Sequence, residues 1–331
     1  MTQRHAIAWA HGMASVQALG GMLGPVTFLL PDGRQVSPLH VAPWFDDPTR
    51  SAQPPILQEL RGEWPCVPFG TDALRALPEG WSATGETFDG ADVPHGHSSN
   101  VEWVFTKTTH DHIALTCDYP EAHPIRRLTR TIAADPKAPA LDITLTVEAR
   151  RPCRLPIGLH PTLRLPLTGQ ARLESPAFRQ GRTFPLDVEP GQGRLFPGAT
   201  FPSLTAIPSR DGTTLSLTHL PLTENTEELV QLCGVTGGFR LHHPDGWHVA
   251  LDWDTSHFPS LLLWISNQGR SYAPWNSRHV ALGVEPVCAA FDLGPAVSNA
   301  PNPISAAGIA TAHAFDPDTP FTTRYRIGVG T

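Results

Sequence analysis

The sequence predicts an all-β protein, a large antiparallel β-sandwich, and three observations lead to this fold class. Apolar and polar residues alternate with period two along most of the chain, as they do in half-buried strands. The 331 residues include 28 glycines and 35 prolines, which suits many strands joined by tight turns. No amphipathic segment of helical length competes with this pattern. Because large sandwiches exceed the usual domain size and no linker or repeat interrupts the chain, we expect a single domain spanning residues 1–331.

The expected strands follow one another at regular spacing. Residues 26–30 lead into the turn Pro31-Asp32-Gly33, which predicts a hairpin. Strands bounded by Asp, Pro or Gly are then expected at residues 101–106, 112–117, 127–132 and 141–147. After a Pro- and Gly-rich connection, further strands are expected at residues 214–217, 229–233, 239–242, 248–253, 261–265, 279–284 and 322–329. The alternation is absent from residues 51–57 and 292–314, which we expect to form loops.

Charge and composition exclude several classes of function. The net charge is −7 and Lys107 and Lys137 are the only lysines, so the basic surface needed to bind nucleic acid is missing. No apolar run approaches the ~18 residues of a membrane helix and no cleavable leader is visible, so we expect a cytoplasmic protein without a membrane partner. The five cysteines are widely spaced, which favours reduced core thiols. Motifs of nucleotide binding and serine hydrolysis are absent.

Glu285 is a candidate general base. It follows the apolar run 280–284, which carries its carboxyl group toward the interior, where burial raises a carboxyl pKa. Gly283 and Pro286 on either side set special backbone angles. Beside a bound hydroxyl, such a carboxylate is a suitable general base. The alternative is a structural glutamate at the end of a strand, held by backbone amides or an arginine.

Histidines near glycine and proline are the other candidates for proton transfer. His160 follows an apolar run and precedes Pro161, and an imidazole with an ordinary pKa of ~6.5 suits a general acid at neutral pH. The alternative is a core histidine. His95 and His97 would point the same way in a strand, so a two-histidine metal site is a further alternative, although no third ligand is close in sequence. His242 and His243 would face opposite sides of a strand, which weakens a joint role as ligands.

Arg61 and several aromatic residues complete the candidate site. Arg61 precedes Gly62 and a proline-punctuated segment, so its guanidinium, a planar fork of donors, is held to suit vicinal hydroxyls, a carboxylate or a phosphate. A surface salt bridge is the alternative. Aromatic side chains that either pack against a sugar ring or belong to the core are Trp64, Phe69, Trp103, Trp264 and Trp275.

Four short segments together resemble the aldose 1-epimerase (mutarotase) family, most closely its hexose-phosphate mutarotase branch. They are residues 60–70 (LRGEWPCVPFG), 94–97 (PHGH), 158–161 (GLHP) and 283–286 (GVEP). The corresponding stretches of the family read like IRGGIPICFP-FG, HGFAR, G-H-P-Y-F and VEP, in the same order. The resemblance implies a large antiparallel β-sandwich with its site on a concave sheet face.

The resemblance also implies roles for individual residues. Glu285 matches the general base and His160 the general acid. Arg61 matches an arginine that contacts the sugar or its phosphate, and His95 matches the histidine of the HGF segment. Glu227, in residues 226–230 (TEELV), takes the place of an aspartate that binds sugar hydroxyls.

Three departures from the family pattern bear on the substrate. Ser98 and Ser99 stand where a second arginine is expected, which removes positive charge, and Glu63 replaces a glycine, which adds negative charge near the expected phosphate pocket. We therefore expect a neutral hexose rather than a phosphorylated one. Thr162 replaces an aromatic residue after His-Pro, which opens the pocket or changes ring stacking.

The expected function is therefore interconversion of the α and β anomers of a hexose by acid–base ring opening, with a small-molecule sugar as partner and with no metal or organic cofactor. Two alternatives stay open: a non-catalytic carbohydrate-binding or sensing sandwich, and a metal-dependent sugar isomerase or dioxygenase that uses His95 and His97 as ligands.

Overall fold

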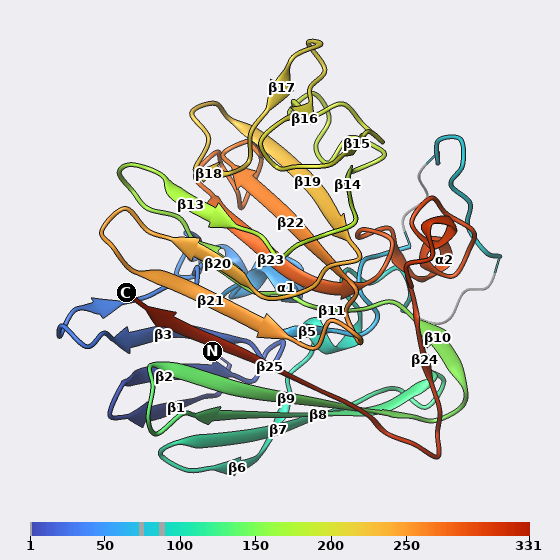
Figure 1. The fold of residues 1–331 in the computed structure, drawn as a ribbon. Coiled ribbons are helices and arrows are strands. Elements are labelled where there is room, and N and C mark those ends of the chain that lie inside the picture. Colours follow the sequence, from blue (N-terminus) through green and yellow to red (C-terminus); the bar gives the residue numbers. More distant parts are fainter. Residues whose placement is uncertain (1, 73–75, 86–89) are drawn as a thin grey trace.

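Two large antiparallel sheets dominate the protein, and residues 2–72, 76–85 and 90–331 are described by the structure, a computed structural model (Figure 1). The predicted all-β class is thus confirmed. The eight-stranded sheet runs in the order β15 (Thr200–Phe201), β14 (Gln180–Thr183), β19 (Thr226–Cys233), β22 (Ser260–Asn267), β23 (Val280–Cys288), β11 (Ile157–Leu159) and β5 (Pro65–Cys66), with β12 (Thr162–Arg164) also paired to β23.

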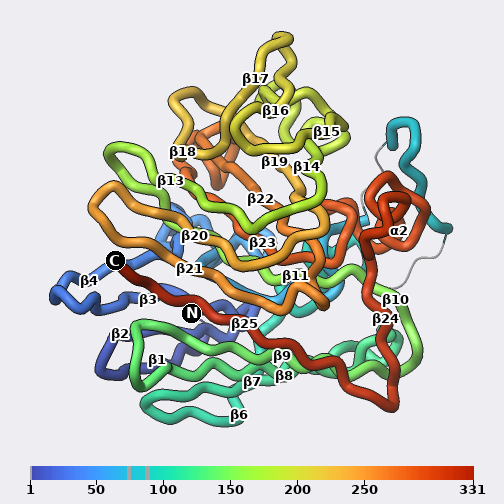
Figure 2. The backbone as a smooth tube through the Cα atoms, viewed as in Figure 1, coloured from blue at the N-terminus to red at the C-terminus, as the bar shows by residue number. Residues whose placement is uncertain are grey.

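The second sheet has nine strands and the chain ends within it, since its last strand lies between two earlier ones (Figure 2). Its order is β18 (His219–Leu220), β13 (Ala171–Glu174), β20 (Phe239–His242), β21 (His248–Trp253), β25 (Phe321–Gly330), β9 (Ala140–Ala149), β8 (Ile125–Ala134), β7 (His112–Asp118) and β6 (Val104–Thr108).

Smaller elements flank the two sheets. An N-terminal four-stranded sheet contains β1 (Arg4–Trp9), β2 (Gly12–Gln17), β3 (Leu23–Leu29) and β4 (Gln35–Val36), and two further pairs are β10 (Cys153–Leu155) with β24 (His313–Phe315) and β16 (Ile207–Pro208) with β17 (Thr214–Leu215). The helical turns are η1 (Arg50–Ala52), α1 (Pro55–Gln58), η2 (His97–Ser99), α2 (Gly294–Ser298) and η3 (Ser305–Ala307).

Strands predicted from alternation are present, and their boundaries shift by a few residues. β7 to β9, β19 to β23 and β25 cover the expected segments, and β3 and β4 form the expected hairpin. The expectation of loops at residues 51–57 and 292–314 was wrong in part, because these segments contain η1, α1, α2, η3 and β24. Elements this short carry too few residues for a periodic signal.

Central strands of the eight-stranded sheet are buried on both faces. Along β22, Leu261, Leu263 and Ile265 belong to the main core, whereas Leu262 and Trp264 belong to a second apolar cluster on the opposite face. β9 instead alternates between buried and more accessible residues, as expected for one solvated face. The eight-stranded sheet therefore has a covered outer face on which a pocket can form.

The cysteines form no disulfide, and the helices of the described residues are short. All five cysteines are free, and all except the half-buried Cys153 are buried. Among the described residues, no helix has the length and apolar character required to cross a membrane.

Candidate active site

A break in one strand brings His160 beside Glu285. β11 pairs with Val287 and Cys288 of β23, and β12 pairs with residues 281–283, so residues 284–286 face the interruption between β11 and β12. His160 lies in this interruption, where its backbone N–H donates to the backbone carbonyl of Trp64 at 2.9 Å. Pro286, which has no N–H to donate, lies in the same stretch of β23. The two predicted catalytic residues therefore come from adjacent segments of one sheet.

Glu285 lies within β23, where the sequence led us to expect a strand end. Its side chain points to the same face as Gly283 two residues earlier. A Cβ at Gly283 would lie 2.4 Å from Glu285 Oε1 and 3.0 Å from Trp264 Cβ. The glycine thus provides the space in which the carboxylate rests.

The His160 ring is fixed by aromatic neighbours. It stacks on Trp64 with ring centroids 4.1 Å apart and an interplanar angle of 14°, and His95 meets it edge-on at 5.0 Å. Its Nε2 lies 3.5 Å from Glu285 Oε1, and its Nδ1 lies 3.4 Å from the hydroxyl oxygen of Thr162. Thr162, which replaces an aromatic residue of the family pattern, thus contacts the proposed acid.

Burial shifts the pKa values of both groups in opposite directions. Burial raises the pKa of the Glu285 carboxyl well above its ordinary value, and the negative charge of Asp292 raises it further. Burial lowers the pKa of His160 well below its ordinary value, and His95 adds to this effect. Both shifts favour a protonated carboxyl beside a neutral imidazole over the ion pair.

His95 enters the site from a strained loop. Its φ is +55°, in the left-handed region that non-glycine residues rarely adopt. Its Nδ1 accepts a hydrogen bond from the Gly70 N–H at 3.4 Å, which leaves the ring proton on Nε2. Burial lowers the pKa of His95 to about 4. A neutral imidazole with one donor is the result.

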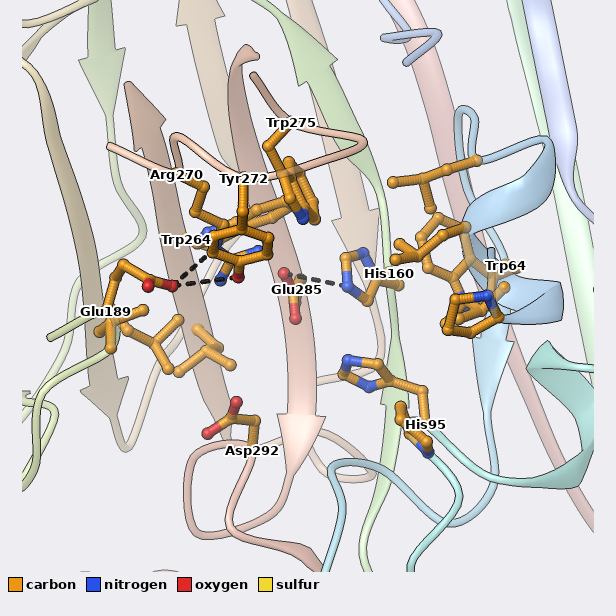
Figure 3. Close-up of a pocket in the computed structure, with 18 residues that line it drawn as sticks. Trp64, His95, His160, Glu189, Trp264, Arg270, Tyr272, Trp275, Glu285 and Asp292 are labelled. Carbon is orange, nitrogen blue, oxygen red and sulfur yellow. Dashed lines mark hydrogen bonds and ion pairs between the residues drawn. The ribbon is translucent and has the colours of Figure 1, made fainter. Parts of the chain in front are cut away.

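Glu285 and His160 lie in a cavity of about 410 Å³, a size that suits a small-molecule ligand. Figure 3 shows Glu285 in its middle, His160 and Trp64 to one side, and Arg270, Tyr272 and Glu189 to the other. Residues that lie far apart in the chain line it: Pro54, Ile56, Leu57, Leu60, Trp64, Pro94, His95, His160, Val188, Glu189, Leu229, Leu262, Trp264, Arg270, Tyr272, Trp275, Glu285 and Asp292.

Glu227 lies behind the wall of this cavity. Its carboxylate accepts hydrogen bonds from Trp264 Nε1 at 3.1 Å and from the Ser266 hydroxyl at 2.8 Å, and it lies 3.8 Å from Arg270 Nε. Burial raises its pKa, while Arg270 acts in the opposite direction. Glu227 therefore holds Trp264 and Arg270 in place, a role different from the direct hydroxyl contact that the resemblance implied.

Arg61 is turned away from the cavity. Its Nε donates to the Glu59 carbonyl at 3.0 Å, its Nη2 lies 3.9 Å from the Glu59 carboxylate, and its guanidinium covers the Phe45 ring at 5.2 Å. Arg4 and Arg50 approach the same carboxylate. The expected contact between Arg61 and a sugar is therefore not part of the site geometry, because the buried carboxylate of Glu59 holds the guanidinium.

The expectation that Glu63 adds negative charge to the pocket was also wrong. Glu63 is fully buried and forms an ion pair with Arg130, and it accepts a hydrogen bond from the Tyr325 hydroxyl at 2.6 Å. Its charge is compensated inside the protein.

The serines that replace the second family arginine, Ser98 and Ser99, donate to the carbonyls of Pro65 and His95 and are fully buried. They supply no charge to the cavity.

Other predicted residues separate in the structure. His97 contacts the Asp118 carbonyl and the Tyr119 ring, away from His95, so the two histidines do not converge. No set of three potential metal-ligating side chains occurs within residues 2–72, 76–85 and 90–331. His242 meets Glu174 and His243 stacks on Trp247, both outside the cavity.

Of the aromatic candidates, Trp64, Trp264 and Trp275 line the cavity, while Phe69 and Trp103 are core residues.

Sequence reasoning missed Arg270, Tyr272, Glu189 and Asp292. Arg270 and Tyr272 lie on the loop between β22 and β23. The signal was available, because residues 268–278 (QGRSYAPWNSR) join the strand of Glu285 to its neighbour and place polar and aromatic side chains at that sheet edge. Glu189 lies between β14 and β15, in a stretch where no pattern marks a site.

Comparisons with solved structures identify the fold. The chain is similar to an Escherichia coli K12 protein named as a candidate aldose 1-epimerase, with 16% identity, a TM-score of 0.65 and coverage of 99% of each chain. A GalM/aldose epimerase homologue from C. elegans matches with 14% identity and a TM-score of 0.64 over 100% of this chain and 99% of that one. A galactose mutarotase-like protein from Lactobacillus casei ATCC 334 matches with 14% identity and a TM-score of 0.61 over 99% of this chain and 100% of that one.

No protein-family model and no curated protein matches the sequence. The structural likeness extends over nearly the whole chain at low identity, so it concerns the fold. The chain has the galactose mutarotase-like fold, as its resemblance to the aldose 1-epimerases predicted.

Proposed function

We propose that the protein is an aldose 1-epimerase that interconverts the α and β anomers of a hexose. The observation that carries the proposal is the pairing of Glu285 and His160, 3.5 Å apart and buried within a sugar-sized cavity. Anomer exchange needs one group to remove the C1 hydroxyl proton and another to protonate the ring oxygen. The pair offers one carboxylate and one imidazole, and the stack on Trp64 fixes the imidazole.

A single proton on the pair is sufficient for the whole cycle. The C1 hydroxyl donates a hydrogen bond to Glu285, which favours the ionised carboxylate, while the ring oxygen accepts one from protonated His160. Glu285 then takes the hydroxyl proton as His160 protonates the ring oxygen, and the C1–O5 bond breaks to give the open aldehyde. After rotation about C1–C2, the reverse transfers close the ring from the other face. The favoured uncharged pair is the form that performs this closure.

His95 is placed to assist this transfer. Its ring lies 5.0 Å from that of His160 and its Nε2 carries a proton, so it can donate to the ring oxygen side of the sugar or to the open carbonyl. Positioned acid and base groups each contribute roughly 10²–10⁴ in rate, or about 3–5 kcal/mol.

Polarimetry of freshly dissolved α-D-glucose and α-D-galactose tests the proposal. We expect the purified protein to accelerate the approach to the equilibrium rotation above the spontaneous rate, and heat-inactivated protein serves as the control. An unchanged rate with both sugars, together with NMR evidence that the sugars bind, would favour the non-catalytic carbohydrate-binding alternative. Activity lost on treatment with EDTA, or formation of a ketose, would favour the metal-dependent isomerase.

A further inference from the structure

Arg270 is presented to the cavity by a self-bonded loop. Residues 268–279 join β22 to β23, and Gln268, Asn276 and Ser277 all have φ between +46° and +64°. Such strained angles persist where the surroundings fix them. Here the Ser277 N–H donates to the Arg270 carbonyl at 2.8 Å, and the Asn276 N–H donates to the Tyr272 carbonyl at 2.9 Å. The loop therefore holds Arg270 in one place.

The Arg270 guanidinium contacts two tryptophan rings and lies near two carboxylates. It lies 4.5 Å from the Trp275 ring centre and 5.4 Å from that of Trp264. Its Nε is buried without a hydrogen-bond partner, although it lies 3.6 Å from Glu189 Oε2 and 3.8 Å from Glu227 Oε2. A buried, unpaired N–H is costly unless a ligand satisfies it.

Glu189 and Tyr272 form the rim beside Arg270. The Tyr272 hydroxyl donates to Glu189 Oε2 at 3.2 Å, so one carboxylate oxygen is shared between this hydroxyl and the guanidinium. Both Arg270 and Glu189 retain 20% side-chain exposure. Figure 3 shows this group across the cavity from His160.

The balance of charge around the cavity is negative. Three carboxyl groups, of Glu189, Glu285 and Asp292, line it, and with Glu285 protonated two of them are charged, whereas Arg270 is the sole arginine or lysine among the described lining residues. Glu227 adds a fourth carboxyl group behind Arg270. An anionic sugar that approached Arg270 would therefore come close to at least one carboxylate for each favourable contact with the guanidinium.

We propose that Arg270 and Glu189 form a wall that selects neutral sugars: Arg270 donates hydrogen bonds to ring hydroxyls away from the reacting C1–O5 edge, and Glu189 repels sugars that carry a carboxylate or phosphate. This inference rests on the proposed function for the orientation of the ring. Glu227 acts as the positioning residue for Arg270. The preference for a neutral hexose thus comes from residues other than Glu63, Ser98 and Ser99.

Binding of methyl glycosides tests this wall separately from catalysis, because a methyl glycoside has no free anomeric hydroxyl to exchange. Dissociation constants for methyl β-D-glucopyranoside and methyl β-D-glucuronide are measured by ligand-observed NMR at low and at high salt. We expect the wild-type protein to bind the neutral glycoside at least tenfold more tightly at low salt, equivalent to ~1.4 kcal/mol, with a smaller ratio at high salt.

Three variants and a control assign the effect to Glu189 and Arg270. Glu189→Gln should lower the neutral-to-anionic ratio severalfold, mainly by improving glucuronide binding. Arg270→Gln should weaken binding of the neutral glycoside about tenfold, and Arg270→Lys should be intermediate because it keeps the charge and loses the planar fork. Arg324→Gln, an exposed position on β25, should leave both constants unchanged.

Three results would each overturn the proposal that Arg270 and Glu189 select neutral sugars. They are equal affinity of the wild-type protein for the two glycosides, failure of both glycosides to bind, and an unchanged affinity ratio in Glu189→Gln. Glu189→Gln keeps the test valid if Arg270→Gln fails to fold, since Glu189 lies on a loop at the rim. If the wild-type protein prefers the neutral glycoside as expected but shows no anomer exchange in polarimetry, the proposed catalysis is rejected and the proposed selection of neutral sugars is retained.

Discussion

The chemistry of the site depends on the close packing of two side chains, Glu285 and His160. Glu285 rests over Gly283, and its Oε1 lies 3.5 Å from Nε2 of His160. Asp292 lines the same cavity and acts on Glu285 through its charge. The environment of each group therefore sets which one holds the proton at a given pH.

The pH dependence of the exchange rate should reveal the influence of Asp292. The Glu285–His160 pair must hold one proton, and Glu285 holds it in the favoured form, so kcat/KM should fall as rising pH removes this proton through the raised pKa of Glu285. Burial is the larger cause of this elevation and Asp292 the smaller. In Asp292→Asn a nearby negative charge is removed, the pKa of Glu285 falls, and the alkaline limb of the kcat/KM profile should move to lower pH. A limb that stays in place or moves to higher pH would show that Asp292 does not act on the base.

The sequence singled out the proposed catalytic residues, which the structure brings together, whereas it did not single out Arg270 and Glu189. Glu285, His160 and His95 occur in motifs with glycine and proline. The glycines and prolines create the backbone breaks and close approaches that bring the three side chains together. Arg270 and Glu189 have no such local signature, since their role depends on loops that meet only in the folded chain. Arg61 had the signature but is held by Glu59, a residue two positions earlier whose burial no local pattern revealed.

At the level of elements, β23 and its neighbours determine the site. β23 carries Glu285 in the centre of a sheet, and the interruption between β11 and β12 admits His160. The strand was predictable from its apolar run, but the interruption was not, because it depends on which segments pair. The loop at residues 268–279 is rich in polar and aromatic residues, but its place as one wall of the cavity likewise depends on which strands pair.

Gly283→Ala tests the close packing within β23. The added Cβ would overlap Glu285 Oε1 at 2.4 Å and press on Trp264 Cβ at 3.0 Å, so the carboxylate must move. Gly283 has an ordinary strand conformation, and the fold should be retained. Since a displacement of about 1 Å can cost 10²-fold in rate, we expect kcat to fall at least tenfold with little change in the thermal melting temperature. Wild-type kcat in this variant would mean that the carboxylate position is not critical.

At the level of the whole molecule, one buried polar network connects the site segment to the nine-stranded sheet. Glu63 lies just before β5, Arg130 lies on β8 and Tyr325 on β25, and all three are buried. Arg130 Nη2 donates to the Tyr325 hydroxyl at 3.2 Å as well as to Glu63. The alternation of the strands predicted the two large sheets, but no pattern indicated that Glu63 would pair with an arginine 67 positions later.

Glu63→Gln should destabilise the protein by about 3–5 kcal/mol, because it leaves the buried Arg130 guanidinium without a counter-charge. The free energy of unfolding in urea measures this loss. The paired replacement Glu63→Leu with Arg130→Met removes both charges and should cost markedly less. A single variant within ~1 kcal/mol of the wild-type protein would contradict the importance of this network for stability.

The role of Glu285 as the general base is tested most directly by the anomer exchange rate of Glu285→Gln. This rate is measured by two-dimensional exchange NMR with glucose. The amide is isosteric with the carboxylate but cannot accept the C1 hydroxyl proton. We predict a rate at least about 10²-fold below wild type, with an unchanged circular dichroism spectrum and retained sugar binding, and a wild-type rate for the matched strand variant Glu148→Gln on β9. A Glu285→Gln protein that keeps more than about a tenth of the wild-type rate would contradict the assignment of Glu285 as the base.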